Sequence, residues 1–234
     1  MKNLNQSKNI KVNDVFNAVF DKYDLMNDLM SLGMHRIWKN NFVNWINPNK
    51  SINFLDMSSG TGDIAKEISK KINSQGRITC VDPNFNMIKK GKERLKNFKN
   101  IKWICSSAEK LPFKSESFDV YAVSFGIRNF NDINKSLKEA YRVLKPGGRF
   151  MCLEFSKVEN EFLEKLYKTY SKTIPYLGKR LIGEARPYEY LIKSIENFYN
   201  QSELSEILRK NKFSEIEYRN LSGGIVTIHS CWKI

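Results

Sequence analysis

The sequence has no stretch of eighteen or so apolar residues, and residues 1–8 carry no apolar signal core and are not rich in arginine. A helix that crosses a bilayer needs about 20 predominantly apolar residues. A secretory signal peptide needs an apolar core, and a transit peptide is rich in arginine. A transmembrane helix is therefore excluded, and we expect the chain to stay in the cytoplasm. With 234 residues, of which 41% are hydrophobic, a full core is within reach.

Cysteine is also scarce. The four cysteines are Cys80, Cys105, Cys152 and Cys231, and their spacing is not that of a metal site. Three of them lie in apolar, strand-like runs. We therefore expect buried free thiols, no disulfide and no metal.

Acidic residues are fewer than basic ones, 25 against 39, which gives a net charge of +14. Such a charge suits a nucleic acid or an anionic membrane surface. The lysines, however, are spread evenly, and no Lys/Arg run is interleaved with the stacking aromatics that single-strand binders need. We favour a compositional bias towards Lys, Asn and Ile, and expect no nucleic-acid partner.

Apolar runs alternate with helical patterns through the middle of the chain, which predicts a parallel sheet. The predicted strands cover residues 52–57, 77–81, 101–105, 118–124 and 149–154, and the predicted helices cover 63–72, 84–97 and 133–144. Lys145-Pro146-Gly147-Gly148 is expected to stop the last of these helices. A helix over 201–210 and strands over 213–219 and 225–232 follow, and Gly223-Gly224 predicts an antiparallel hairpin.

Two helical segments stand outside this alternation. Residues 12–46 predict two or three helices before the first strand. Residues 159–199 are helical and aromatic-rich, broken at Pro175, Gly178, Gly183 and Pro187, and we interpret them as an insertion that covers the site. The expected single domain, 1–234, thus has four parts: a helical cap (12–46), a cofactor-binding core (50–157), a helical lid (158–200) and a C-terminal helix with a β-hairpin (201–234).

The first predicted strand leads through Asp56 into the loop Ser58-Ser59-Gly60-Thr61-Gly62-Asp63. A strand, a Gly-x-Gly-x-x-Ala turn and a helix are typical of a nucleotide-type site. A pyrophosphate would meet Asp56 and Asp63 there, and two unit charges about 4 Å apart repel by about 4 kcal/mol at an effective dielectric near 20. The loop suits a ligand with no phosphate, an ammonium and a sulfonium, which describes S-adenosylmethionine.

Ligands of an open parallel sheet bind at the carboxyl ends of the strands. Asp82 ends the second strand, where a carboxylate accepts both ribose hydroxyls, caps the next helix, or does both. Ser107 and Ala108 follow the third strand, in a turn that presents N–H groups to an adenine edge or is a plain connection. Ser124 ends the fourth strand, and Arg128 beyond it orients a substrate oxygen or forms a surface salt bridge.

In order and spacing, these features and Leu144-Lys145-Pro146-Gly147-Gly148 resemble a class I S-adenosylmethionine-dependent methyltransferase. That resemblance implies an α/β, Rossmann-like sheet of seven strands, mostly parallel with the last antiparallel, and helices on both faces. A closer resemblance is to the ubiquinone/menaquinone biosynthesis C-methyltransferases. It rests on Phe20–Lys39, nearly the N-terminal signature of that family, on Ser124–Asn129 and Tyr141–Arg149, which look like its second signature, and on matches at 153–157, 190–195 and 221–226.

The family resemblance implies S-adenosylmethionine-dependent methylation of a ring carbon on a polyprenylated quinol, which is 2-polyprenyl-6-methoxy-1,4-benzoquinol, demethylmenaquinol or both. The expected cofactor-binding residues are Asp56, Gly60, Thr61, Gly62, Asp82, Ser107, Ala108 and Ser124. The chain departs from the family in two places. Ser58-Ser59 replaces a small Ala/Gly pair, and Ser107 stands where Asn or Asp is frequent.

At the substrate end we expect Tyr23, Asp24, Asn27 and Arg128, because they cluster in the two family signatures. Arg128 would orient a ring oxygen or an activating water. His35 is the obvious titratable base, but its position before Arg36 and Trp38 favours a packing or surface role.

The prenyl tail implies peripheral contact with the inner membrane surface or with other quinone-biosynthesis enzymes, and a homodimer is left open. Two competing functions remain. One is methylation of another acceptor, such as a sterol, a small phenol or tRNA. The other is a non-catalytic cofactor-binding scaffold in a quinone-synthesis assembly.

Overall fold

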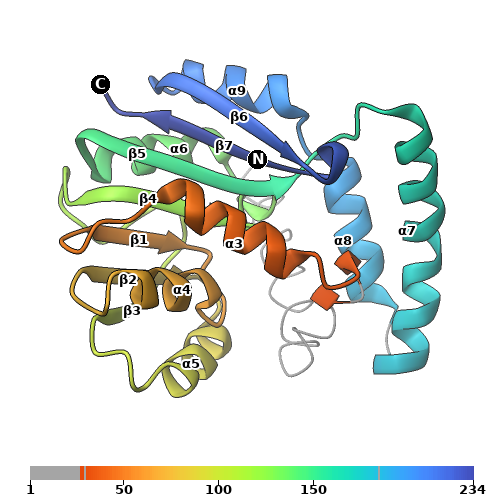
Figure 1. Cartoon of the computed structure of the whole chain (residues 1–234), viewed down its shortest axis with the longest axis horizontal. Coiled ribbons are helices and arrows are strands. Elements are labelled where there is room, and N and C mark those ends of the chain that lie inside the picture. Colours follow the sequence, from red (N-terminus) through yellow and green to blue (C-terminus); the bar gives the residue numbers. More distant parts are fainter. Residues whose placement is uncertain (1–26, 29, 184) are drawn as a thin grey trace.

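Figure 1 shows a computed structural model of the chain, which describes residues 27–28, 30–183 and 185–234. A seven-stranded sheet with the order β3-β2-β1-β4-β5-β7-β6 forms its centre. The strands are β1 (Asn53–Met57), β2 (Arg77–Asp82), β3 (Ile101–Cys105), β4 (Phe118–Ser124), β5 (Leu144–Phe155), β6 (Ser214–Leu221) and β7 (Val226–Trp232). Strands β1 to β5 are parallel, and β7 runs antiparallel to both β5 and β6. The predicted fold class and the terminal hairpin are confirmed.

Helices cover both faces of the sheet. They are α3 (His35–Ile46), α4 (Asp63–Lys71), α5 (Phe85–Arg94), α6 (Ile133–Val143) and α9 (Gln201–Lys210). Successive side chains of a strand point to opposite faces, so Phe54 and Leu55 of β1 are both fully buried but belong to different core clusters. Phe54 packs in the cluster that contains Phe42 of α3, and Leu55 in the cluster that contains Leu137 of α6. In Figure 1, α3 crosses in front of the sheet and α6 lies behind it.

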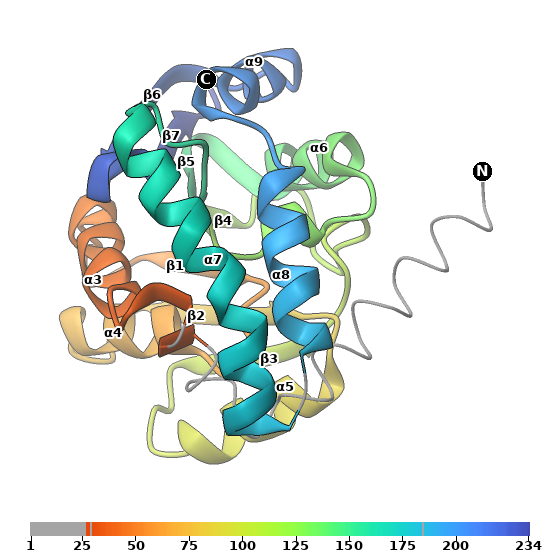
Figure 2. The same ribbon diagram turned by 90° about the vertical axis from the view of Figure 1, so that its right-hand side faces the viewer.

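The segment between β5 and α9 is helical, as predicted, and consists of α7 (Glu161–Ile182) and α8 (Arg186–Glu196). The two helices lie side by side in both views (Figure 2). The predicted breaks at Pro175 and Gly178 are wrong, because α7 runs through both. A Cβ on Gly178 would lie 2.2 Å from the ring of Tyr188, so this glycine serves close helix packing. Gly183, in the left-handed region, ends α7, and Pro187 lies in the first turn of α8.

The segment Lys145–Gly148 is part of β5 and not a separate turn. Helix α6 does end at Val143, but the strand begins directly afterwards, and its register with β4 shifts between Phe118 and Val120. The N–H of Gly147 donates to Lys233 O at 2.7 Å, and the N–H of Lys233 donates to Gly148 O at 2.9 Å. The glycines therefore tie β5 to the end of β7.

Of the residues predicted to form N-terminal helices, 12–26 and 29 lie outside the described part of the chain. Across the described ranges, no helix is long and apolar enough to cross a membrane.

Candidate functional site

Two cavities open at the carboxyl ends of β1, β2 and β4 and share Ser58, Gly60, Ser124 and Phe125. The first, here called the Asp82 cavity, is also lined by Asp82, Asn84, Met87, Ser107, Ala108 and Asn129. The second, the Arg128 cavity, is also lined by Asn27, His35, Asp56, Thr61, Arg128, Phe155 and Leu191. Because they share four residues, they form one cleft with two ends.

The two glycines of the loop after β1 have different roles. Gly60 has a positive φ of 54° and donates its N–H to Asp82 Oδ2 at 2.9 Å, and a Cβ there would meet no atom within 4 Å. A Cβ on Gly62 would lie 2.8 Å from both Leu95 and Trp103. Gly60 therefore leaves the floor of the cleft open, whereas Gly62 lets the start of α4 pack closely against Leu95 and Trp103.

Asp82 is a buried residue that lines the Asp82 cavity. Its Oδ1 accepts the N–H of Asn84 at 2.8 Å, and burial raises the pKa of Asp82 to about 6 despite this bond and the one from Gly60. Asn84 is the N-cap of α5, because its side chain accepts from the N–H groups of Asn86 and Met87. The alternative in which Asp82 caps the helix is therefore wrong. Each carboxylate oxygen retains a second lone pair for a ligand.

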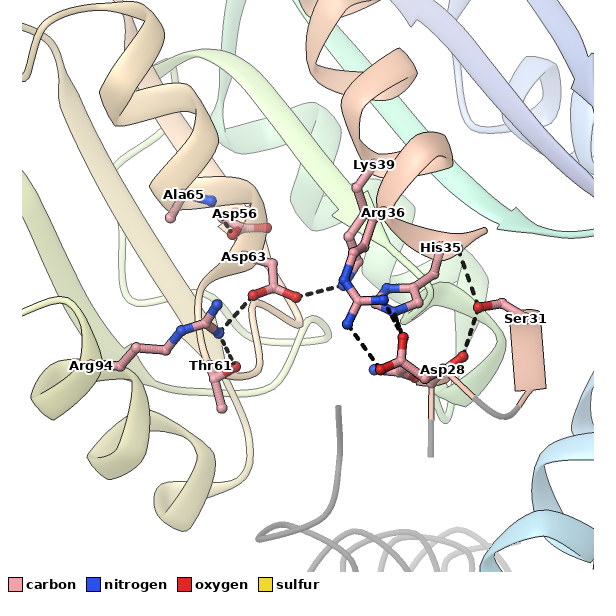
Figure 3. A network of polar contacts seen from close by, with 11 residues as sticks. Asp28, Ser31, His35, Arg36, Lys39, Asp56, Thr61, Asp63, Ala65 and Arg94 are labelled. Atoms are coloured by element: carbon pink, nitrogen blue, oxygen red, sulfur yellow. Dashed lines mark hydrogen bonds and ion pairs between the residues drawn. The ribbon is translucent and has the colours of Figure 1, made fainter. Parts of the chain in front are cut away.

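The two carboxyl groups that flank the loop have pKa values shifted in opposite directions; their surroundings are drawn in Figure 3. Lys39 Nζ and Arg94 Nη1 each lie 2.6 Å from an oxygen of Asp63. Burial alone would raise the pKa of Asp63, but these two cations outweigh it and hold the pKa far below its usual value. Asp56 accepts the N–H of Ala65 at 3.2 Å, and burial raises its pKa to about 8. The loop therefore carries less free negative charge than the sequence indicated.

Arg128 is buried and held on three sides. Its Nη1 lies 2.7 Å from Glu154 Oε1 and donates to Phe125 O, also at 2.7 Å, and its Nε donates to Ser194 Oγ at 3.3 Å. The Arg128 and Glu154 side chains are 5% and 2% exposed, so the alternative of a surface salt bridge is wrong. Burial raises the pKa of Glu154, against the opposing charge of Arg128. The guanidinium is a fixed cation at the wall of the Arg128 cavity.

His35 is the first residue of α3 and lines the same cavity. It is buried, which fits the packing role of the two predicted alternatives and not the surface role. Its Nε2 lies 3.0 Å from Asp28 Oδ1, and its Nδ1 is buried without a hydrogen-bond partner among the described residues (Figure 3). Burial, followed by the charge of Lys39, lowers the pKa of His35. A hydrogen bond from Arg36 is the main cause that lowers the pKa of Asp28 to about 2.

Most of the residues predicted for the site meet at the cleft. Ser107 and Ala108 line the Asp82 cavity, Asn27 lines the Arg128 cavity, and Ser124 lines both. The Oγ atom of Ser124 is buried and has no partner among the described residues. Tyr23 and Asp24 lie outside the described part of the chain.

Sequence reasoning missed Lys39, Arg94 and Glu154. A buried carboxylate or guanidinium needs a partner of opposite charge, and this need is the signal that could have prompted a search for them. Among the described residues, no group of three or more His, Cys, Asp and Glu side chains could hold a metal ion. All four cysteines are free, but Cys105 is exposed, contrary to the prediction of buried thiols.

A sequence model of the ubiE/COQ5 methyltransferase family matches residues 3–233. The ubiquinone/menaquinone biosynthesis C-methyltransferase UbiE of Rickettsia bellii is 51% identical over 230 residues, which covers 95% of this chain and 92% of the relative. The UbiE protein of Rickettsia prowazekii is 50% identical with the same coverage.

Solved structures share the fold. A methyltransferase from Thermotoga maritima, described as S-adenosylmethionine-dependent and a possible histamine N-methyltransferase, has a TM-score of 0.68 at 20% identity and covers 94% of this chain and 99% of its own. A phosphoethanolamine N-methyltransferase from Haemonchus contortus, solved with S-adenosylhomocysteine, has a TM-score of 0.63 at 18% identity and covers 83% of this chain and 52% of its own.

Proposed function

Because the chain belongs to the ubiE/COQ5 methyltransferase family, we propose that it transfers the methyl group of S-adenosylmethionine to a ring carbon of a polyprenylated quinol in ubiquinone/menaquinone biosynthesis. The observation that carries this proposal is the cleft with two unlike ends. One end is lined by Asp82, and the other by Arg128 and apolar side chains, and they meet at Ser124 and Phe125.

The residues of the Asp82 cavity fit S-adenosylmethionine. Asp82 has lone pairs for the two ribose hydroxyls, and the turn at Ala108 would hold the adenine. The buried Oγ of Ser124 still needs a partner. Asp56, whose pKa is raised to about 8, faces the other end, where an ammonium would favour its ionised form. When bound, S-adenosylmethionine supplies an electrophilic methyl group.

The Arg128 cavity fits an aromatic acceptor. Met30, Phe155 and Leu191 give it apolar walls, which exclude water from the reaction. Phe125 belongs to both cavities and has a positive φ of 55°, a strained conformation for an aromatic residue. Its carbonyl accepts from Arg128, and its N–H donates to Leu153 O at 2.7 Å. We propose that these bonds fix Phe125 where donor and acceptor meet, since methyl transfer needs strict alignment.

The quinol must lose a phenolic proton as its ring carbon becomes nucleophilic. A guanidinium stays protonated in proteins, so Arg128 would orient the ring oxygen or a water and would not take the proton. Asn27, with Tyr23 and Asp24, would complete this end of the site. His35 would accept the proton, directly or through a water, because Asp28 binds its Nε2 and leaves Nδ1 as the acceptor.

We also propose a cytoplasmic enzyme in which α7 and α8 act as the lid. A long prenyl tail stays in lipid, so the protein would contact the membrane surface peripherally.

Incubation with labelled S-adenosylmethionine and a panel of acceptors tests the function. The panel contains demethylmenaquinol, 2-polyprenyl-6-methoxy-1,4-benzoquinol, the oxidised form of each, a small phenol and tRNA. We expect label in one or both quinols and none in the electron-poor quinones or in tRNA. Absence of transfer to any quinol would contradict the proposal, and cofactor binding without transfer to any acceptor would favour a scaffold.

A further inference from the structure

The outward face of α7 forms one continuous stripe. Its exposed residues between Phe162 and Arg180 recur at intervals of three and four, which places them on a single side of the helix. They are Phe162, Lys165, Leu166, Thr169, Lys172, Thr173, Tyr176, Lys179 and Arg180, here called the α7 stripe. The opposite side carries Ser171, Ile174 and Gly178, which are buried. Figure 2 shows α7 in front of the rest of the fold, with α8 beside it.

The composition of the α7 stripe is unusual for a free surface. Phe162, Leu166 and Tyr176 are 72%, 52% and 69% exposed. The stripe also carries four cations, Lys165, Lys172, Lys179 and Arg180, and none of them forms an ion pair with another described residue. Large apolar side chains and cations thus alternate along a helix face of about 27 Å. This combination is typical of helices that lie in the interface of an anionic bilayer.

A second copy of the chain fits the stripe less well. A symmetric contact would place one set of four cations against another, and like charges oppose each other across an interface. An anionic lipid surface satisfies both features, since headgroups attract the cations and the acyl region accepts the apolar side chains.

We infer that the α7 stripe docks the protein on an anionic lipid surface. Lysine and arginine side chains face the headgroups, and Phe162, Leu166 and Tyr176 enter the boundary of the acyl region. This inference names the surface for the peripheral contact proposed above, but it does not depend on the identity of the methyl acceptor. The neighbouring helix α8 contributes Leu191 to the Arg128 cavity and Ser194 to Arg128. Docking through α7 therefore brings this end of the cleft close to the lipid.

Co-sedimentation of the full chain with vesicles tests the inference. The vesicles are phosphatidylcholine alone, or phosphatidylcholine with phosphatidylglycerol, and no quinol is present. One variant removes charge from the stripe (Lys165→Gln, Lys172→Gln and Lys179→Gln), and another removes its apolar side chains (Phe162→Ser, Leu166→Ser and Tyr176→Ser). The matched control is Lys89→Gln, Lys92→Gln and Lys96→Gln, which makes the same charge change at exposed positions on and just after α5.

We expect the wild-type chain to bind the phosphatidylglycerol vesicles, and removal of three stripe charges to lower the partition about a hundredfold. The apolar variant should lose at least about tenfold, while the α5 control stays within about twofold of wild type. Thermal unfolding shows whether each variant is folded. Equal losses in the stripe and control variants, or no binding by the wild type, would overturn the inference. The inference would also be overturned if a stripe variant kept its vesicle binding but had a different oligomeric state from wild type in sedimentation velocity.

Discussion

Glu154 at the end of β5 holds Arg128, which follows β4, in an ion pair of 2.7 Å that is almost completely buried. The position of the cation in the cleft thus depends on a residue of the neighbouring strand. Removing one partner of such a pair leaves an uncompensated buried charge, which costs about 3–5 kcal/mol.

Two variants distinguish the structural role of the Arg128–Glu154 pair from its catalytic role. We expect Glu154→Gln to lower the free energy of unfolding by about 3–5 kcal/mol and to abolish most turnover. The double variant Arg128→Met/Glu154→Leu leaves no unpaired charge and should unfold within about 1–2 kcal/mol of wild type, yet remain inactive. Urea unfolding and methyl transfer provide the two readouts. A stable double variant with wild-type turnover would show that Arg128 does not act on the substrate.

Asp82 should control cofactor affinity. In Asp82→Asn, an amide NH₂ replaces one oxygen that accepts a backbone N–H, so we expect S-adenosylmethionine to bind at least about tenfold more weakly. Since the pKa of Asp82 is raised to about 6, wild-type affinity should rise between pH 5 and pH 7 as the carboxyl ionises, and the variant should lack this rise. Isothermal titration calorimetry measures both. Cys105→Ser, at an exposed position, is the control, and an equal loss there would remove Asp82 from the cofactor site.

Asp63 links α3 to α4 and α5 through Lys39 and Arg94. We expect Asp63→Asn to lower the free energy of unfolding by about 1–3 kcal/mol at neutral pH, because two cations lose a common partner. The folded pKa of Asp63 is depressed, so its contribution is present above the unfolded pKa of about 4 and fades as pH falls further. The control is Glu67→Gln, which breaks an exposed pair with Lys70 at 2.9 Å on the same helix and should cost less than about 1 kcal/mol. Equal costs would contradict a special role of Asp63.

We expect His229 to make stability depend on pH between about 4 and 6.5. Burial lowers its pKa from 6.5 to about 4, so the folded chain keeps it neutral while the unfolded chain binds a proton. Stability should therefore fall as pH falls through this window, by up to about 3 kcal/mol. His229→Gln retains a donor for Gln201 O, the present partner of Nε2 at 3.0 Å, and should lose less stability from pH 7 to pH 4.5. Chemical unfolding at each pH provides the comparison, and parallel curves would contradict the prediction.

The sheet was largely predictable because strand signals are local. The bounds predicted for β3 (101–105), β4 (118–124) and the C-terminal helix α9 (201–210) are those of the structure. The alternation of apolar runs with turn residues suffices there. Helix ends were less exact, since the predicted 84–97 ends at Arg94. The unbroken course of α7 could not be predicted, because only the contact between Gly178 and Tyr188 explains the glycine.

The strand-end residues of the cleft were predictable for the same topological reason, because Asp82 and Ser124 end parallel strands and Asp56 is the last residue but one of β1. The charge states of the carboxyl groups at the cleft could not be predicted. Asp63 forms an ion pair with Lys39, which precedes it by 24 residues, and Glu154 forms one with Arg128, which precedes it by 26. Burial and ion pairing between residues distant in the sequence set these pKa values, and neither can be predicted from the local sequence.

The most direct test of the proposed function locates the transferred methyl group. S-adenosylmethionine labelled with ¹³C in its methyl group is incubated with the enzyme and each of the two quinols, and the product is examined by NMR. We predict that the labelled carbon is bonded to a ring carbon, and that Arg128→Met/Glu154→Leu gives no such product. A labelled methyl ether, or no labelled quinol at all, would contradict C-methylation in this cleft.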